Sequence, residues 1–452
     1  MSEERAGETR HDVRPHPVNE VMPPGRMMAY GLQHILVMYT GVITVPLVLA
    51  TAIGLPQEEL AYIINACLLT CGVATLIQTI GFWKIGVRLP IIMGTSFAAA
   101  IPMIQIGDVY GLQGIYGAVI VSGIFVFLIS PYFSLLLHFF PPVVTGTVIT
   151  VIGLSIMPVA VRWAAGGDPE AENFGNPVNI AMAFVVLLLI VVITRFFGGL
   201  VGGFVGRIAI LLGLMLGTII AALFGLADFG GVAEAGWLRI TTPFYFGLPT
   251  FHLVPIISMM IAMLVIMVET TADTVAIGEI TDRPIRQDNL ARALRTDGFS
   301  TVLGGVLNAF PITTFSQNVG LVRFTNVKSR FVAAVGGIIL ILIGIFPKLG
   351  AVVAAIPIPV LGGAGLMLFG TIAIVGIQIL SRVDFEDNRN LVTVAVSLGL
   401  GLIPVAVPDF YGGFPIGVQM MFESGIAAAT IAAVLLNLFF KVLGGKQGEI
   451  RG

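Results

Sequence analysis

Residues 253–277 read LVPIISMMIAMLVIMVETTADTVAI and place two acids, Glu269 and Asp273, inside an apolar run long enough to cross a bilayer. A spanning helix needs about 20 apolar residues, and a charged side chain at that depth costs roughly 2.5–3.5 kcal/mol on insertion scales. The two acids are four residues apart, so they lie side by side on one helical face. Intramembrane carboxylates typically mark a substrate, ion or proton site. This stretch therefore predicts a membrane helix that carries a functional site.

The composition of the whole chain agrees with a membrane protein. Of its 452 residues 57% are hydrophobic and 11% are charged, whereas soluble domains carry about 25% charged residues. The net charge of −2 offers no basic surface for nucleic acid. No HExxH motif, phosphate loop or nucleophile elbow occurs, so we predict that the chain is not an enzyme. Cys67 and Cys71 lie at helical spacing in an apolar run, which indicates packing residues, and we expect no metal site.

Apolar segments recur from end to end, separated by short polar breaks. They predict an all-α polytopic membrane protein with fourteen transmembrane segments. Their approximate limits are 29–52, 60–82, 90–106, 113–130, 140–161, 178–194, 208–227, 251–278, 290–310, 313–325, 331–347, 357–380, 390–406 and 424–440.

The placement of basic residues supports this count. With fourteen crossings both termini share one side, and twenty of the 23 Lys and Arg residues fall on it, leaving only Arg162, Arg239 and Lys348 on the other. Lys and Arg are enriched in cytoplasmic loops. We therefore predict a multi-pass protein of the plasma (inner) membrane with both termini cytoplasmic. Residues 1–25 are polar, contain Pro and lack a hydrophobic signal core, which predicts a disordered cytoplasmic tail.

Two segments begin with unusually polar sequence at matching positions. The third starts Pro90-Ile-Ile-Met-Gly-Thr-Ser-Phe97 and the tenth starts Pro311-Ile-Thr-Thr-Phe-Ser-Gln-Asn318, an offset of 221 residues. A second pair, Pro142-Val-Val-Thr-Gly146 and Pro359-Val-Leu-Gly-Gly363, gives 217. This displacement equals seven crossings, and an odd number inverts the second half. The pattern predicts a 7+7 inverted repeat with short unwound or strand pieces in segments three and ten, as in secondary transporters. Close helix packing through Gly, Ser and Thr is the alternative.

The start of the tenth segment has side chains suited to a planar ligand. Gln317 offers one acceptor and two N–H donors, and it is followed by Asn318 and Gly320. A carboxylate at Glu269 can accept two N–H bonds side by side, and such charge-assisted bonds are strong. The combination points to a neutral or weakly anionic heterocycle rich in N–H and C=O groups. A small inorganic anion would favour Arg or Lys, and Glu269 would repel it.

These residues resemble the nucleobase–ascorbate transporter family, the nucleobase:cation symporters of the second class. Its signature is Gln or Glu, Asn, any residue, Gly, four variable residues, Thr, and then Arg, Lys or Gly. Here it reads Gln317-Asn-Val-Gly320-Leu-Val-Arg-Phe-Thr325-Asn326, with Asn326 departing from the pattern. The resemblance extends over nearly the whole chain after the tail. Further matches are Gly31-Leu-Gln-His34, Gly94-Thr-Ser-Phe97, Glu269-Thr-Thr-Ala-Asp273 and Asp297.

The resemblance implies a role for each matched residue. Glu269 would bind the N–H edge of a nucleobase and Gln317 the opposite polar edge. Phe97 would pack on the ring plane, and backbone N–H groups near Ser96, Phe97 and Asn318 would complete the contacts. Members with Gln at the position of Gln317 look like xanthine and uric acid permeases, whereas uracil carriers tend to have Glu there. We therefore expect uptake of an oxidised purine, with uracil or another nucleobase as the alternative.

The resemblance also implies the architecture of a carrier that works by alternating access. Residues 26–132 and 246–348, segments one to four and eight to eleven, would form a core that holds the substrate. Residues 133–245 and 349–445 would form a gate and the contact of a homodimer. The substrate and the lipid bilayer are the other expected partners.

Protons are the expected coupling ion, and no other cofactor is expected. Burial disfavours a charged carboxylate, and Glu269 and Asp273 on one face repel each other, so one of them is expected to hold a proton. Substrate binding to ionised Glu269 would be linked to protonation of Asp273, Asp297 or His34. Each of these three residues also has an alternative role that does not involve coupling. His34 is then a packing residue, Asp297 an interfacial acid paired with Arg292 or Arg295 and Asp273 a structural acid. Sodium coupling also remains open, since the family's animal members look sodium-dependent.

Two other classes compete with this interpretation. An anion exchanger or channel of the same architecture predicts a cation or an empty polar position where Glu269 stands. An intramembrane hydrolase would use Glu269 and Asp273 as an acid–base pair. However, catalytic aspartates of presenilin-like enzymes lie on different helices, whereas these two acids share one.

Overall fold

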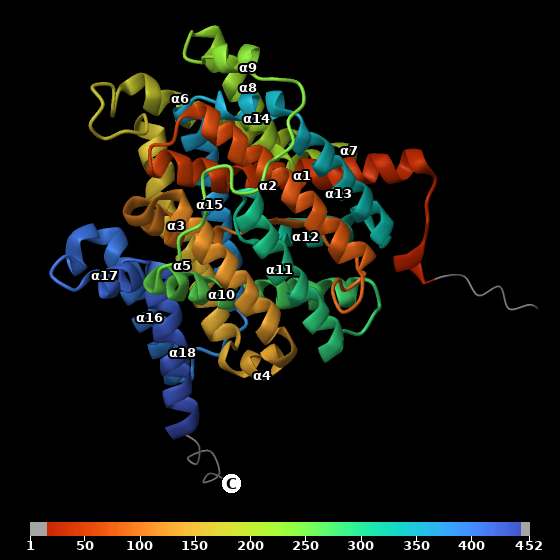
Figure 1. Cartoon of the computed structure of the whole chain (residues 1–452), viewed down its shortest axis with the longest axis vertical. Helices are drawn as coiled ribbons and strands as arrows, with labels where there is room; N and C mark the ends of the chain where they lie inside the picture. The colour runs from red at the N-terminus through yellow and green to blue at the C-terminus, as the bar shows by residue number, and fades with distance from the viewer. Residues whose placement is uncertain (1–15, 444–452) are drawn as a thin grey trace, which may run out of the picture.

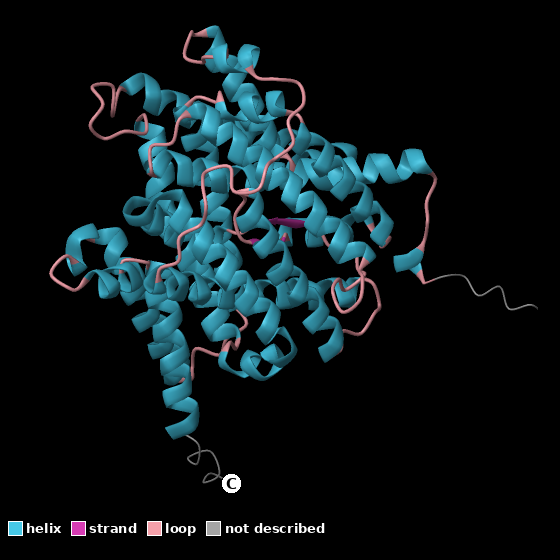
Figure 2. Cartoon of the chain, viewed as in Figure 1, coloured by secondary structure: helices cyan, strands magenta, loops and turns pink. Residues whose placement is uncertain are grey.

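The computed structural model describes residues 16–443, and almost all of the regular structure in them is helical (Figure 1, Figure 2). Lipid offers no partner for a backbone N–H or C=O group, so apolar runs of this length fold as helices. The helices of the first half are α1 Pro24–Ala52, α2 Gln57–Ile80, α3 Ala100–Ile129, α4 Phe133–Leu136, α5 Pro142–Ala165, α6 Pro177–Val192, α7 Leu200–Arg207, α8 Ala209–Leu223 and α9 Gly230–Glu234. Those of the second half are α10 Leu253–Ile280, α11 Gln287–Leu307, α12 Ser316–Thr325, α13 Arg330–Ile345, α14 Pro347–Ala354, α15 Ile358–Leu380, α16 Asn388–Ala406, α17 Ile416–Phe422 and α18 Gly425–Leu443.

Short turns and two strands complete the described elements. The strands are β1 Met93–Thr95 and β2 Ile312–Thr314, and Figure 2 shows them near the middle of the molecule. The 3-10 turns are η1 Pro17–Asn19, η2 Phe97–Ala99, η3 Ser130–Tyr132, η4 Leu137–Phe139 and η6 Pro408–Tyr411, and a π turn, η5, covers Ile193–Phe197.

Two of the expected segments are joined into one long helix. α3 has 30 residues, which at 1.5 Å per residue is about 45 Å, longer than a hydrocarbon core of about 30 Å. The helix is broken at Gly111, whose φ of 66° and ψ of −172° are not helical. The pieces before and after Gly111 correspond to the segments expected at 90–106 and 113–130. The first of these segments is irregular up to residue 99, where β1 and η2 replace the helix.

Length and hydropathy alone identify fewer crossings than the fourteen expected. Within the described residues eight helices are long and apolar enough to cross a membrane, or nine if α13 and α14, bent by 79° at their junction, form one span. This test treats α3 as a single helix. α12 and α8 have only 10 and 15 residues, and the first turns of α11 carry charged residues. Each of the fourteen expected segments nevertheless overlaps a helix.

The described part of the expected N-terminal tail is ordered. Residues 1–15 lie outside the described residues, but η1 follows directly and buries Val18 completely. Arg330 Nε donates to Asn19 Oδ1 at 2.9 Å, and the Ser329 hydroxyl donates to the Glu20 carbonyl. These contacts attach residues 18–20 to the start of α13.

The helices fall into two groups by the neighbours that they pack against. In one group α1, α2 and α14 pack around α13 or one another, and α10 and α11 pack on α3. In the other, α5, α6, α8, α15, α16 and α18 pack on each other, with α5 and α15 side by side. The contact between α5 and α15 is close because it passes through glycine. A Cβ at Gly153 would lie 2.7 Å from the Phe369 carbonyl oxygen and closer still to the Ala373 nitrogen.

We predict that Gly153→Ala lowers the midpoint of thermal unfolding in detergent. The added methyl group meets backbone atoms that cannot rotate away, and overpacking of this kind costs about 1–3 kcal/mol. Gly399→Ala in α16 is the matched control, because a Cβ there has no neighbour within 4 Å and Ala is the better helix former. Its midpoint should be unchanged or higher. Equal midpoints for the two variants would contradict the close contact of α5 with α15.

Candidate functional site

The two unwound segments pair with each other through their backbones. β1 and β2 are antiparallel, and the partners are Met93 with Thr314, Gly94 with Thr313 and Thr95 with Ile312. Beyond the strands, Ser96 N donates to Pro311 O and Phe315 N donates to Ile92 O, both at 3.0 Å. All six strand residues are buried. Unpaired backbone at this depth would cost several kcal/mol per group, so this pairing allows two helices to be interrupted inside the protein.

Asp273 connects α10 to the unwound segment of the second half. Its Oδ2 accepts hydrogen bonds from Thr314 Oγ1 at 2.7 Å and from Ser316 Oγ at 2.9 Å. Ser316 immediately precedes Gln317, so a carboxylate on one helix holds the residue beside the expected ligand-binding amide. Neither hydroxyl is identifiable as a partner of Asp273 from the sequence alone. The richness of the tenth segment in Ser and Thr was the available signal, but it did not indicate which acid they would contact.

Asp297 on α11 is a buried acid without a hydrogen-bond partner. Its side chain is 0% exposed, and within the described residues neither carboxyl oxygen has a partner. The Thr270 hydroxyl lies nearby without reaching hydrogen-bond geometry, and contacts Thr313 Oγ1 at 3.1 Å instead. Burying a carboxylate without a partner costs much free energy, whereas burying the neutral acid costs much less.

The interfacial alternative for Asp297 is therefore wrong. Arg292 Nε donates to the Gly86 carbonyl at 2.9 Å, and Arg295 Nη1 donates to the Lys84 carbonyl at 3.4 Å. Both arginines thus face the loop after α2. The ion pairs found among the described residues are Lys328 with Asp282 and Arg389 with Asp387, and Asp297 is in neither.

His34 and Asn318 hold α1 against α12. Asn318 Nδ2 lies 2.9 Å from the His34 carbonyl oxygen and 3.0 Å from His34 Nδ1. A carbonyl oxygen only accepts, so the atom facing it must be the amide nitrogen, which then also donates to Nδ1. His34 is consequently the neutral tautomer with its proton on Nε2. Asn318 Oδ1 is buried and has no partner among the described residues.

The remaining expected residues surround this junction. Gln317 is partly exposed in the first turn of α12. Phe97 is half-buried and meets Phe369 of α15 edge to face, with ring centroids 6.1 Å apart. Gly320 faces α7, since a Cβ there would lie 3.4 Å from Arg207 Nη1. The N–H of Ser96 donates to Pro311 O and that of Asn318 to Phe315 O at 2.9 Å, so both already have acceptors within the chain.

Glu269 lies where α10 meets α5. It borders a cavity of about 10 Å³ together with Val265 and Val268 of its own helix and Thr145, Val148 and Ile149 of α5. That volume holds about one water molecule, so this conformation leaves no room for a purine on that side of Glu269. α10 also packs against η2, α11, β2 and α12. The helix that carries Glu269 therefore touches the elements that carry Phe97, Asp297 and Gln317.

Several other ionisable groups have structural roles. At the end of α10, Lys328 Nζ donates to Asp282 Oδ2 at 2.7 Å, and this hydrogen bond lowers the pKa of that exposed carboxyl. Cys67 and Cys71 are buried free thiols. Within residues 16–443, no group of three or more His, Cys, Asp or Glu side chains is arranged to hold a metal ion.

Comparison with known proteins identifies close relatives. A family model described as "Permease family" (Xan_ur_permease) matches residues 25–410. A xanthine permease of Bacillus subtilis is 44% identical, with 92% of this chain and 94% of the relative covered. The uric acid transporter UacT of Escherichia coli is 44% identical, with 94% and 88% covered. A nucleobase transporter, PlUacP of Paenibacillus larvae, is 41% identical, with 95% and 98% covered.

Solved structures with lower identity share the fold. The transmembrane domain of the cyanobacterial bicarbonate transporter BicA superposes with a TM-score of 0.55 at 16% identity, with 93% of this chain and 99% of that chain covered. SLC26A9 superposes with a TM-score of 0.61 at 12% identity, with 92% and 66% covered. At such identities the likeness concerns the fold alone.

We predict that Asn318→Asp lowers the thermal unfolding midpoint in detergent. The change replaces a donor by an acceptor facing two acceptors of His34, and a buried unsatisfied group costs about 1–3 kcal/mol, more when charged. Asn388→Asp, at the exposed first position of α16, is the control, because an acid is favourable at a helix N-terminus. A midpoint for Asn318→Asp equal to that of the control would refute the assigned direction of the hydrogen bonds.

Proposed function

This chain belongs to the permease family of nucleobase–ascorbate transporters, and we propose that it imports an oxidised purine, uric acid or xanthine, by proton symport. It is a multi-pass membrane protein and not an enzyme. Relatives that are 44% identical over most of both chains are named a xanthine permease and a uric acid transporter. The observation that carries the proposal is the contact of α10, which bears Glu269, with the unwound segment that positions Gln317.

The proposed site binds the two polar edges and the face of a planar ring. Glu269 accepts N–H groups from one edge, and a carboxylate does so strongly when it replaces water in a closed site. Gln317 pairs with the opposite edge, where its amide supplies both a donor and an acceptor. Phe97, which precedes the first helical piece of α3, covers the ring. Since Glu269 also borders α5, the substrate would lie between the two groups of helices.

The packing of the helices supports fourteen crossings arranged as a 7+7 inverted repeat. A displacement of seven segments relates α1 to α10, α2 to α11 and α5 to α15. Their contacts correspond, because α1 and α2 both pack on α13, while α10 and α11 both pack on α3. α5 packs directly on its counterpart α15. The antiparallel pairing of β1 with β2 is also what an axis between inverted halves would produce.

Transport proceeds in this proposal by alternating access. The group of helices around α13 and α3 forms the core (26–132 and 246–348), and the group around α5 and α15 forms the gate (133–245 and 349–445). The core moves against the gate so that the midplane site faces each side in turn. The gate also forms a homodimer, and both termini lie on the cytoplasmic side of the inner membrane.

Two acids in the core suit proton coupling. Asp297 is buried and has no hydrogen-bond partner in residues 16–443, so a proton there removes an uncompensated charge. Asp273 accepts the hydroxyl of Ser316 beside Gln317, so its charge influences the segment that contacts the substrate. His34 accepts a hydrogen bond at Nδ1, and a proton at that atom would displace Asn318. Protons serve as the coupling ion in this proposal, and no other cofactor takes part.

A second candidate is an anion exchanger of the same architecture, since the bicarbonate transporter BicA shares the fold of this chain. An anion exchanger would not need a carboxylate at position 269, and Glu269 would repel its substrate. Uracil or another nucleobase is the alternative within the family, and Gln317 argues against uracil by resemblance. A competition panel of xanthine, urate, uracil, guanine and hypoxanthine against labelled xanthine distinguishes these ligands directly.

We predict that Glu269→Gln reduces uptake of labelled xanthine or urate at least 100-fold while the amount of protein in the membrane is unchanged. Losing a charged hydrogen-bond partner costs about 1.5–3 kcal/mol, and the substituted amide also presents a donor to the ligand N–H groups. Glu279→Gln, ten residues further along α10 and exposed, is the control and should transport normally. Retention of uptake by Glu269→Gln would favour the anion exchanger and reject the site.

We predict that acid outside stimulates uptake, since a proton then enters with each substrate down its gradient. A protonophore should abolish accumulation, whereas replacing sodium by potassium should not change it. Asp273→Asn and Asp297→Asn identify the carboxyl that carries the proton, because only its replacement should remove the dependence of uptake on external pH. Asp282→Asn is the control. Dependence on sodium without dependence on pH would reject proton coupling.

A further inference from the structure

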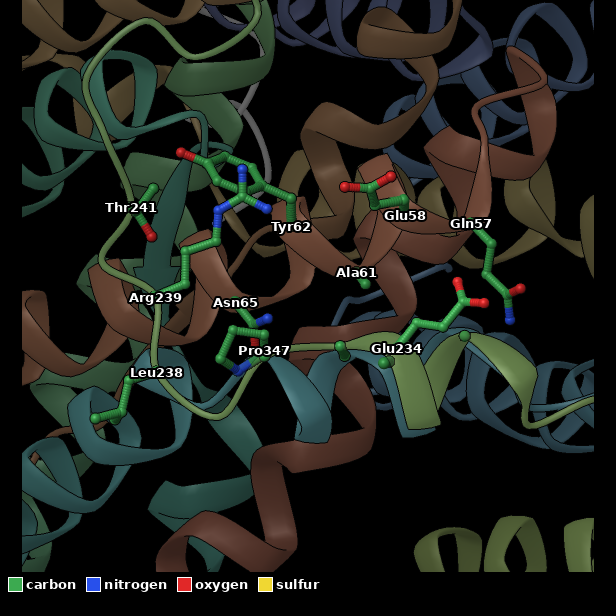
Figure 3. Close-up of a pocket in the computed structure, with 14 residues that line it drawn as sticks. Gln57, Glu58, Ala61, Tyr62, Asn65, Glu234, Leu238, Arg239, Thr241 and Pro347 are labelled. Carbon is green, nitrogen blue, oxygen red and sulfur yellow. The ribbon is translucent and has the colours of Figure 1, made fainter.

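The clearest unassigned feature is a cavity of about 630 Å³ at one end of the molecule. It lies between the start of α2, the segment 230–241 that contains α9, and α14 (Figure 3). In Figure 1, α9 and α14 are at the top, opposite the C-terminal end of α18. The start of α2, which lines the cavity, follows the C-terminal end of α1. The length of α1 therefore separates the cavity from the start of α1, and the cavity opens on the side that the charge pattern assigns to the exterior. Its volume is in the range that holds a drug-sized ligand.

The walls of the cavity are held in place by hydrogen bonds. The Tyr62 hydroxyl accepts from Thr242 N at 2.9 Å, Arg239 N donates to the Ile345 carbonyl at 3.1 Å, and Asn308 Nδ2 donates to the Thr242 carbonyl at 2.9 Å. Lys348 Nζ donates to the Val232 carbonyl at 3.0 Å and thereby joins α14 to α9. The segment that covers the cavity is thus attached to α2, α11, α13 and α14.

Arg239 is presented to the cavity by two aromatic rings. Its guanidinium lies 4.9 Å from the Tyr62 ring centroid and 5.0 Å from that of Tyr245, and the two rings stack at 4.0 Å. Figure 3 shows Arg239 against Tyr62. Contact with the rings restrains the guanidinium while its N–H groups stay free. Within the described residues its side chain has no hydrogen-bond acceptor or carboxylate partner.

The other side of the cavity supplies acceptors. Glu58 and Glu234 are both exposed to it, and Figure 3 shows them apart from Arg239. Asn65 also lines the cavity; its side chain is only 6% exposed, and its Oδ1 has no partner among the described residues. The Asn65 amide is covered by protein and lies against Gly350 of α14, so the acceptors open to the cavity are the carboxylates of Glu58 and Glu234.

This set of groups selects a planar ligand with both donors and acceptors. Two carboxylates would repel a small inorganic anion, and Arg239 would repel a metal cation. A ring with C=O groups on one edge and N–H groups on another fits both sides, with a flat face suited to the restrained guanidinium and the aromatic rings. An oxidised purine has this pattern.

We propose that this cavity is an outer binding site for the transported purine. The inference rests on the proposed function for the identity of the ligand. Both connections between core and gate on this side border the cavity, since 224–252 joins α8 to α10 and α14 joins α13 to α15. A purine captured there is held beside the segments that must move when the core changes sides, before it reaches the midplane.

The test is equilibrium binding of labelled xanthine to the purified full chain, up to the solubility limit of the ligand. Wild type should show two classes of site, and Glu269→Gln should keep only the weaker, outer one. Arg239→Ala should weaken that class about 10- to 100-fold, because a charged hydrogen bond is lost, and should raise the KM for uptake with little change in the maximum rate. The control is Arg162→Gln, which removes an exposed positive charge expected on the same side and should change neither.

A second variant distinguishes loss of the outer site from loss of folding. Gly236→Trp places a large ring in the cavity from a position where a Cβ has no neighbour within 4 Å, and it should remove the outer class without lowering thermal stability. A single class of site in wild type, or a second class that survives both Arg239→Ala and Gly236→Trp, would overturn the outer site. If Glu269→Gln retains both classes and full uptake, the midplane proposal fails, and the two outer-site variants still decide the outer proposal.

Discussion

The antiparallel pairing of β1 with β2 is the interaction on which the rest of the structure depends. Two helices of a membrane protein can be interrupted only if the exposed backbone groups find partners, because lipid provides none. Here each interrupted segment, Met93–Thr95 and Ile312–Thr314, supplies the partners of the other. One half of the chain therefore completes the other, and the ends of both interrupted helices are brought to one place inside the protein.

Around this pairing, side chains connect the helices that a carrier would have to coordinate. Asp273 on α10 accepts the hydroxyls of Thr314 and Ser316, and Asn318 donates to His34 on α1. Neither carboxyl oxygen of Asp297 on α11 has a hydrogen-bond partner among the described residues. Because the same short segment contacts an ionisable acid and carries Gln317, a change of protonation and a change of ligand occupancy affect the same backbone. This arrangement provides a physical basis for coupling two binding events.

The fold is shared with a bicarbonate transporter and an anion transporter, and a fold by itself does not determine the substrate. In this chain the interrupted helices carry the side chains of Phe97 and Gln317, and Arg239 and Glu58 line the cavity beside α9 and α14. A fold of this kind supplies two groups of helices and a buried region where the two groups contact each other. The chemistry of the ligand is decided by what those positions carry.

From the sequence alone, the apolar runs determined a helical membrane protein, the prolines at positions 90 and 311 determined where two helices are interrupted, and the signature around Gln317 determined the family. These features are local, because hydropathy and backbone restrictions act on neighbouring residues. The sequence did not determine that Asp273 contacts Ser316, that Asp297 is unpaired with any arginine, or that Arg239 stacks on Tyr62. The two contacts join residues that are 43 positions apart, for Asp273 and Ser316, and 177 positions apart, for Tyr62 and Arg239. Many side chains of the same chemistry occur along the chain, and each could be the partner of a buried polar group. Only tertiary packing selects among them, because the folded geometry brings few of them within hydrogen-bond distance.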